Sequence, residues 1–358
     1  ITMNATKEGY AYGFNRSIHA YRLSDGPFLS DPKVNTSIED GDDGPVGGWG
    51  ETYYLSVTAT HASPQPITVY AYIKQLTPQG GNWQLVGSQE ITGMNVTVNF
   101  STTFSKDSSV QGQWLAWFNT SEVNNVSGTA SAAFAIERDD TNNTYISGDA
   151  SNVSRVGSNT TTLKTRVFDI DRPATPVSTE EGLVRITVDG INYGTGQPLF
   201  TSSTGQLTYS FNPSCAYQTG AQKWRTELVN GSSYYKPSTS SEFVVNIYSA
   251  FSLQITSPIN KTFVRGVDTI PLTASLNDAG GCGPVPDANL VFHVNGYECT
   301  GTYSGNGVYS CVIPARVTRL WPIGWYGVLS DAEKPYYDNA TKYLQNSFKL
   351  ISVSAIRA

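Results

Sequence analysis

Residues 53–59 read YYLSVTA, and every second residue from Tyr53 to Ala59 is apolar. Successive side chains of a strand point to opposite faces of its sheet, so this alternation predicts a half-buried β-strand. The same alternation recurs along the chain in residues 67–73, 96–100, 114–118, 132–136, 184–188, 270–274, 290–294 and 309–313. Turns rich in Gly, Pro, Asn and Ser separate these segments, so the sequence predicts an all-β protein of tandem β-sandwich domains.

Composition and turns divide the chain into five parts. An amino-terminal strand is expected in residues 1–24, followed by a glycosylated sandwich in residues 25–170. Residues 171–182 contain two prolines and predict a stiff linker. A second sandwich is expected in residues 183–252, and a third sandwich with a disulfide in residues 253–358.

The 358 residues are unusual in how their polarity is distributed. Charged residues make up only 15%, whereas 38 Ser, 38 Thr and 24 Asn make up 28%. Aromatic residues reach 12%, which excludes wholesale disorder. A nucleic-acid partner is not expected, because 23 basic residues face 29 acidic ones without a basic cluster. No apolar run is long enough for a transmembrane segment.

More than half of the asparagines stand in N-x-S/T acceptor triplets. Chance predicts about 5 such triplets at this Ser and Thr content, so the excess indicates a secreted glycoprotein. Ten of the 13 precede residue 161, which leaves the second half freer for protein contacts. The 13 are Asn4, Asn15, Asn35, Asn95, Asn99, Asn119, Asn125, Asn142, Asn152, Asn159, Asn230, Asn260 and Asn339. Residues 1–4 do not resemble a signal peptide, so we expect a mature chain.

Four cysteines fit an extracellular compartment. Cys299 and Cys311 flank the turn-like SGNG of residues 304–307, so a hairpin would bring them within disulfide reach. This favours Cys299–Cys311 and leaves Cys215–Cys282 to link two domains. Zinc is the rival interpretation, but no Cys-x2-Cys or Cys/His cluster supports it.

The amino-terminal segment has an apolar parity of its own. Tyr10, Tyr12, Phe14 and Ile18 fall on one face of an extended chain. Such a strand can complete its own sheet or the sheet of a neighbouring subunit, and the second case gives head-to-tail assembly.

Acidic residues offer one metal candidate and several carboxylate pairs. Asp40, Asp42 and Asp43 lie in a Gly-rich run that suits Ca²⁺, although a solvated turn explains it as well. No other cofactor is expected. Paired carboxylates are what a glycoside hydrolase needs, and the candidate groups are Glu137/Asp139/Asp140, Asp169/Asp171 and Glu180/Glu181. All lie in loop-like sequence, so we expect no enzyme.

The run LWPIGWY of residues 320–326 contains Trp321, Trp325 and Tyr326. Aromatic rings pack in cores, dominate protein interfaces and stack on sugar rings. Core packing, self-association and carbohydrate binding therefore all remain possible for this patch.

Four stretches of the third part resemble an immunoglobulin-like repeat of archaeal and bacterial surface proteins. They are residues 253–262 (LQITSPINKT), 272–281 (LTASLNDAGG), 287–296 (DANLVFHVNG) and 305–310 (GNGVYS). Residues 42–44 (DDG), 48–58 (GWGETYYLSVT) and 104–106 (FSK) are similar to a related type in archaeal surface glycoproteins. Together the resemblances cover about 60% of the chain, although the four cysteines depart from the usual pattern.

These observations converge on a structural role outside the cell. We expect a cell-surface glycoprotein that assembles with identical subunits into a filament or S-layer, which the resemblance places in an archaeal envelope. An adhesin or carbohydrate-binding stalk is the first alternative, and a secreted glycoside hydrolase is the second.

Overall fold

The computed structural model describes residues 4–5, 13–14, 26–36, 45–61, 66–78, 80–123, 127–170, 172 and 174–352. Strands dominate these residues, so the predicted all-β class is confirmed. Their helical elements are a 3-10 turn at Ser108–Val110 and helix α2 at Ala315–Thr318. The chain divides into two compact units: unit 1 comprises residues 1–142, 168–175 and 230–237, and unit 2 comprises residues 143–167, 176–229 and 238–358.

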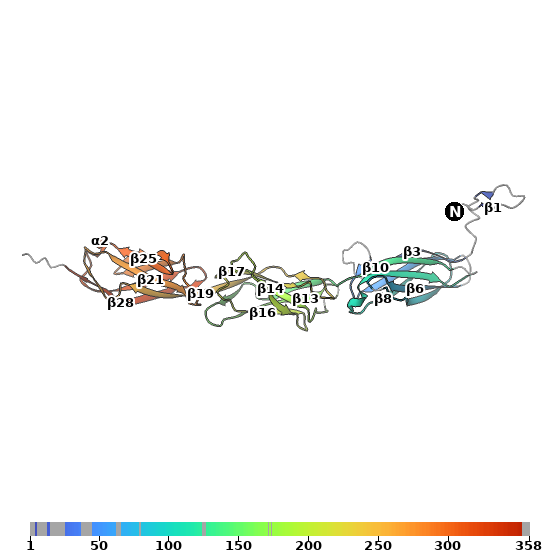
Figure 1. Ribbon diagram of the computed structural model, residues 1–358, viewed down its shortest axis with the longest axis horizontal. Coiled ribbons are helices and arrows are strands. Elements are labelled where there is room, and N and C mark those ends of the chain that lie inside the picture. Colours follow the sequence, from blue (N-terminus) through green and yellow to red (C-terminus); the bar gives the residue numbers. More distant parts are fainter. Residues whose placement is uncertain are drawn as a thin grey trace, which may run out of the picture. The chain divides into compact units, whose positions relative to one another are not determined.

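Unit 1 is built around a two-layer β-sandwich (Figure 1). One layer consists, in spatial order, of β3 (Phe28–Thr36), β5 (Thr52–Thr60) and β8 (Val96–Thr103). The other consists of β4 (Val46–Gly47), β10 (Thr129–Ile136), β9 (Gly112–Thr120), β6 (Ile67–Gln75) and β7 (Gln84–Ile91). These neighbours pair antiparallel except β4 and β10, which run parallel.

The core of unit 1 consists of the alternate apolar residues that the sequence analysis identified in these strands. Val57 of β5, Val69 of β6 and Ala116 of β9 are fully buried between the layers. Larger rings, including those of Tyr53 and Phe118, fill the space around them. Burial of this apolar surface is the main favourable term that holds the layers together.

The amino-terminal strands pair with each other in the described residues. β1 (Asn4–Ala5) runs antiparallel to β2 (Gly13–Phe14), with Asn4 opposite Phe14. Tyr10, Tyr12 and Ile18 lie outside the described residues, so strand exchange stays a prediction.

Unit 2 begins with a sandwich whose first layer is β11 (Thr141–Ser147), β13 (Thr161–Asp169) and β16 (Gln206–Phe211). The facing layer is β15 (Gln197–Phe200), β14 (Glu181–Ile186), β17 (Gly220–Leu228) and β19 (Phe243–Ser257). Two short strands extend it: β12 (Ser151–Ser154) runs parallel to β19, and β18 (Ser238–Thr239) pairs with β17. Trp224 is fully buried between the layers.

The second sandwich of unit 2 also contains β19. Its first layer consists, in spatial order, of β19, β21 (Ile270–Asp278), β25 (Val308–Ile313) and β24 (Thr302–Gly305). The opposite layer is β20 (Lys261–Val264), β28 (Ala340–Ile351), β26 (Gly324–Glu333), β22 (Asn289–Val294) and β23 (Tyr297–Thr300). β27 (Tyr337–Asp338) runs parallel to the middle of β19.

Two of the predicted domain boundaries are wrong. The cut between residues 252 and 253 falls inside β19, a single strand of 15 residues that pairs with β17 and then with β21 (Figure 1). Residues 143–167, predicted within the first sandwich, belong to unit 2, where β13 pairs with β16. Alternation identifies a strand but not its partner, which is why the sequence misplaced both boundaries.

Candidate functional site

Two buried carboxylates of unit 1 bind one arginine. Arg172 donates from Nε to Asp169 Oδ2 at 2.9 Å and from Nη2 to both Asp169 and Asp139. Both carboxylates are completely buried, so the guanidinium is the cation that offsets their charge. Burial lowers the pKa of Arg172, but the hydrogen bond and charge of Asp169, together with the charge of Asp139, outweigh it and raise the pKa above its ordinary value.

The GWG of residues 48–50 makes room for this cluster. A Cβ added to Gly50 would lie 1.4 Å from Arg172 Nη1, and one added to Gly48 would lie 2.7 Å from Asp139 Oδ1. Gly50 also has φ +82°, a conformation that side-chain-bearing residues rarely adopt. Glycine is therefore required at both positions because neighbouring side chains leave no space for a Cβ atom.

Trp49, between these glycines, is the platform on which the cations stack. The guanidinium carbon of Arg172 lies 4.4 Å from its ring centroid, and Lys106 Nζ lies 5.2 Å from it. Lys106 is also 4.7 Å from the rings of Tyr234 and Tyr235. Trp49 Nε1 donates to the carbonyl of Tyr234 at 3.1 Å, which fixes the indole in place.

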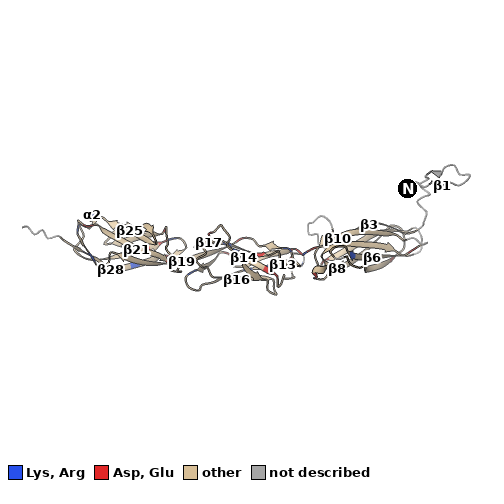
Figure 2. Cartoon of the chain, in the orientation of Figure 1, with Lys and Arg blue, Asp and Glu red and all other residues tan. Residues whose placement is uncertain are grey.

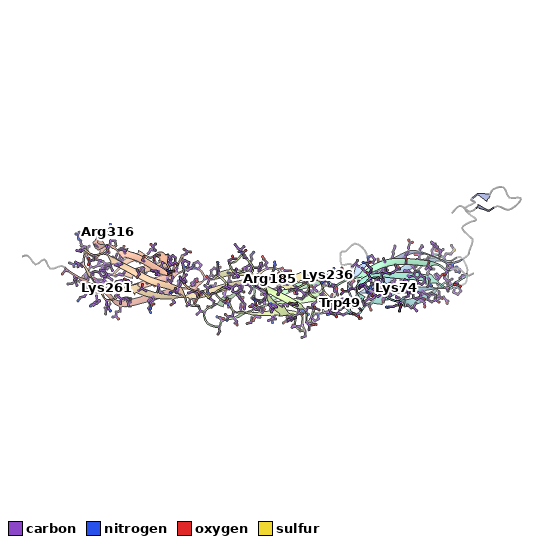
Figure 3. All side chains as sticks on the ribbon, viewed as in Figure 1. Trp49, Lys74, Arg185, Lys236, Lys261 and Arg316 are labelled. Atoms are coloured by element: carbon purple, nitrogen blue, oxygen red, sulfur yellow. A yellow bond between two sulfur atoms is a disulfide. The ribbon has the colours of Figure 1, made fainter. Side chains whose placement is uncertain are left out.

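A third cation, Lys236, lies at the same end of unit 1 as Trp49 (Figure 3). Its ammonium group contacts Glu137 and lies 3.1 Å from Asp140. Burial lowers the pKa of Lys236, but its hydrogen bonds to the two carboxylates outweigh burial and raise the pKa above its ordinary value. Ion pairs thus connect residues 137–140 with residues 169–172 and with Lys236.

Four of the carboxylates considered for glycoside hydrolysis form ion pairs within unit 1. Asp139 and Asp169 come together, as a catalytic pair would, but they share Arg172 rather than facing a substrate. Glu137 and Asp140 both contact Lys236. Asp171 lies outside the described residues; in unit 2, Glu181 is the first residue of β14 and Glu180 precedes it.

Unit 2 has its own buried charge cluster where its two sandwiches meet. Arg155 Nη2 lies 2.5 Å from Asp278 Oδ2, and the two side chains are only 7% and 2% exposed. Ser249 of β19 and Tyr337 of β27 both donate hydroxyl bonds of 2.9 Å to Asp278. Burial raises the pKa of Tyr337, and the hydrogen bond to Asp278 raises it further.

Both predicted disulfides are present, Cys299–Cys311 from the hairpin argument and Cys215–Cys282 as the remaining pair. Cys215–Cys282 spans 67 residues, joining the loop after β16 to the loop after β21, and so connects the two sandwiches of unit 2. Cys299–Cys311 joins β23 to β25 across the third sandwich. Together with β19 and Asp278, the first disulfide makes three independent connections at one junction.

The run LWPIGWY does not form one aromatic patch. Trp321 is 8% exposed and packs against Tyr326, which stacks on Phe348 with centroids 5.4 Å apart. Trp325 alone of the three is exposed, at 49%, with Lys349 Nζ 6.0 Å from its ring. Two of the three rings therefore belong to the core of the second sandwich of unit 2.

The acceptor asparagines of the described residues are mostly at the surface. Asn119 is half-buried, and the following side chains are exposed: Asn35, Asn95, Asn99, Asn142, Asn152, Asn159, Asn230, Asn260 and Asn339. Asn15 and Asn125 lie outside the described residues, as do Asp40, Asp42 and Asp43 of the calcium candidate. Among the residues that the structure does describe, no cluster of three or more acidic, His or Cys side chains suits a metal ion.

One surface feature was missed by the sequence analysis. Tyr70, Tyr72, Trp83 and Trp117 form a row on the outer face of the five-stranded sheet of unit 1, which we call the aromatic strip. The sequence does contain a signal for it: in β6 the buried apolar residues alternate with Tyr70 and Tyr72, which lie on the opposite face of the strand. The helices in the described part of the chain are too short to cross a bilayer.

No family model matches the chain, and no curated protein matches it. Among solved structures, it is similar to a tetra-tandem repeat from the extending region of a large adhesion protein, with a TM-score of 0.49, 13% identity and coverage of 91% of this chain and 75% of that one. It is also similar to part of a 1.5-MDa bacterial ice-binding adhesin, with a TM-score of 0.36, 13% identity and coverage of 91% and 98%. Three N-terminal domains of the bacteriophage RB49 outer capsid protein Hoc give a TM-score of 0.31 at 10% identity, covering 92% and 100%.

Proposed function

We propose that this chain is an extracellular structural glycoprotein that self-assembles into a cell-surface filament or S-layer, with subunits joined by exchange of a chain-end strand. No cofactor is needed for this role. The function is mechanical: β-sandwiches carry load, glycans cover the surface, and covalent links hold domains in register.

The continuity of β19 is the observation that carries the proposal. One strand contributes to the sheets of both sandwiches in unit 2, so tension along the chain passes through sheet hydrogen bonds rather than through a flexible linker. Cys215–Cys282 and the Asp278 cluster connect the same two sandwiches again. Three connections at one junction suit a subunit that bears load along the chain.

The surface chemistry supports an extracellular location. Two disulfides are stable in oxidising compartments, and exposed acceptor asparagines on both units are open to N-glycosylation.

Strand exchange is tested by removing the amino-terminal segment. Deletion of residues 1–24 is expected to leave folded monomers that do not polymerise, because the apolar parity of Tyr10, Tyr12, Phe14 and Ile18 is lost. A matched variant, Ala11→Ser, changes the opposite parity and should polymerise normally. Polymers of unchanged length from the deletion, measured by electron microscopy, would show that this segment does not join the subunits.

A cell-surface adhesin or carbohydrate-binding stalk is the second candidate, because Trp325 is an exposed ring beside Lys349. Trp325→Ala should then abolish binding on a glycan array while leaving assembly intact. An intact chain that binds no glycan on the array would dismiss this candidate.

A further inference from the structure

We infer that Asn119 carries an N-linked oligosaccharide whose first sugars pack on the aromatic strip of the same chain. The inference rests on the proposal that the chain is a glycoprotein. It names one modified residue and the protein surface that holds its sugar.

The aromatic strip is a continuous surface. Tyr70 and Tyr72 have ring centroids 6.4 Å apart, and Tyr72 lies 5.6 Å from Trp117. Trp83 follows at 5.5 Å from Trp117 and is 43% exposed, with Lys74 Nζ 5.7 Å from its ring. The successive rings are tilted by 32–43°.

The strip has the chemistry of a sugar-binding face. Lys74 and Glu90 are the only charged residues in strands β6, β7, β9 and β10, and the strands in Figure 2 are largely uncharged. A pyranose ring presents a C–H face that packs on an aromatic ring, while its hydroxyl groups stay in water.

The register of the sheet places Asn119 at the start of the strip. Asn119 of β9 is directly opposite Tyr70 of β6, and Trp117, two residues earlier on the same face, is opposite Tyr72. Directly opposed residues in a sheet have Cβ atoms about 5 Å apart, so a sugar on Asn119 begins beside the Tyr70 ring.

The side chain of Asn119 provides a second, independent observation. Its Oδ1 atom is buried and has no hydrogen-bond partner among the described residues. A buried carbonyl oxygen without a donor is unfavourable, and the hydroxyl or amide groups of an adjacent sugar supply one. Asn119 begins the acceptor triplet Asn-Thr-Ser, with Ser121 in the third position.

The linkage itself needs a transferase and a lipid-phosphate-linked oligosaccharide as the co-reactant. A bond forms between Asn119 Nδ2 and the anomeric carbon of the sugar, and the bond from that carbon to the phosphate oxygen breaks. The lipid phosphate is the leaving group, and the amide proton is released with it.

Radical footprinting with mass spectrometry tests the inference on the glycosylated protein. The first readout is the occupancy of each acceptor asparagine. The second is the modification rate of Trp83, compared with Trp325, which is similarly exposed but lies on unit 2. If the glycan covers about two thirds of the exposed Trp83 ring, Asn119→Gln should raise the Trp83 rate about threefold and leave Trp325 unchanged.

Three control variants make the result specific. Asn99→Gln removes an acceptor on β8, in the other layer, and should change neither rate. Ser121→Thr keeps the acceptor triplet and should behave like the unchanged chain. Tyr72→Ser keeps the glycan and should raise the Trp83 rate, because the strip is interrupted; it also provides a test if Asn119→Gln does not fold.

The outcomes separate this inference from the proposed function. An unoccupied Asn119 beside other occupied sites, or an unchanged Trp83 rate in Asn119→Gln, overturns the inference alone. Protection of Trp83 only in polymers, independent of Asn119, overturns it in favour of a subunit interface. If no acceptor asparagine carries sugar, the glycoprotein proposal fails as well.

Discussion

Arg155 and Asp278 are 123 residues apart in sequence and form a buried ion pair at the junction of the two sandwiches in unit 2. Removal of one partner leaves the other charge buried without its counterion, which is far more costly than the loss of an exposed pair.

Asp278→Ala should therefore lower the free energy of unfolding by about 3–5 kcal/mol. The measurement is chemical denaturation of the intact chain, monitored by fluorescence. The matched control is Lys223→Ala, which removes the exposed partner of Glu242 and should leave the denaturation midpoint unchanged. Equal effects of the two substitutions would show that burial of the Arg155–Asp278 pair contributes nothing.

Gly50→Ala should destabilise unit 1 more than Gly281→Ala destabilises unit 2. Both glycines have a φ near +80°, so each substitution incurs the same conformational cost of about 1 kcal/mol. A Cβ at Gly281 meets open space, whereas one at Gly50 collides with Arg172. Thermal unfolding of both variants measures the difference. Equal decreases in melting temperature would mean that Arg172 does not lie against Gly50.

Loss of Cys215–Cys282 should cost more stability than loss of Cys299–Cys311. The bridges close loops of 67 and 12 residues, which correspond to about 4 and 3 kcal/mol of chain entropy in the unfolded state. Paired Cys→Ser variants in urea provide the comparison. A larger loss from Cys299→Ser/Cys311→Ser would contradict this ranking of the two disulfides.

Alkaline pH should weaken unit 2. Burial raises the pKa of Tyr337, and the bond to Asp278 raises it further. Burial and the bond to Glu242 raise the pKa of Tyr193 to about 12. A raised folded-state pKa gives stability that is complete below the unfolded pKa of about 10 and is lost as the pH rises through the folded pKa.

The melting temperature measured from about pH 9 to pH 12 should therefore fall across that window. Tyr337→Phe should make the fall shallower, because one of the titrating phenols is gone. A melting temperature that stays constant or rises over this range would contradict the sign of these shifts.

Alternation predicted the strands well because it reports burial on one face, and burial is local. The inner parity of β5 and β6 is the core of unit 1, as residues 53–59 and 67–73 indicate. The partners of strands are not local, so the sequence assigned β13 to the wrong sandwich and divided β19.

The sites show the same limit. Cys299 and Cys311 are only 12 residues apart, so their pairing could be predicted, although the bond crosses from β23 to β25 in the opposite layer rather than across the β24–β25 hairpin. The cluster around Arg172 draws on residues 49, 139 and 235, and the aromatic strip depends on the register between β6 and β9. Long-range register of this kind is set by the packed sheets and leaves no motif in the sequence.

Self-assembly is the central claim, and negative-stain electron microscopy of the purified, intact chain tests it most directly. We predict extended filaments or an ordered lattice of subunits. A uniform population of single, unassembled particles at every concentration and ionic strength tried would contradict the claim.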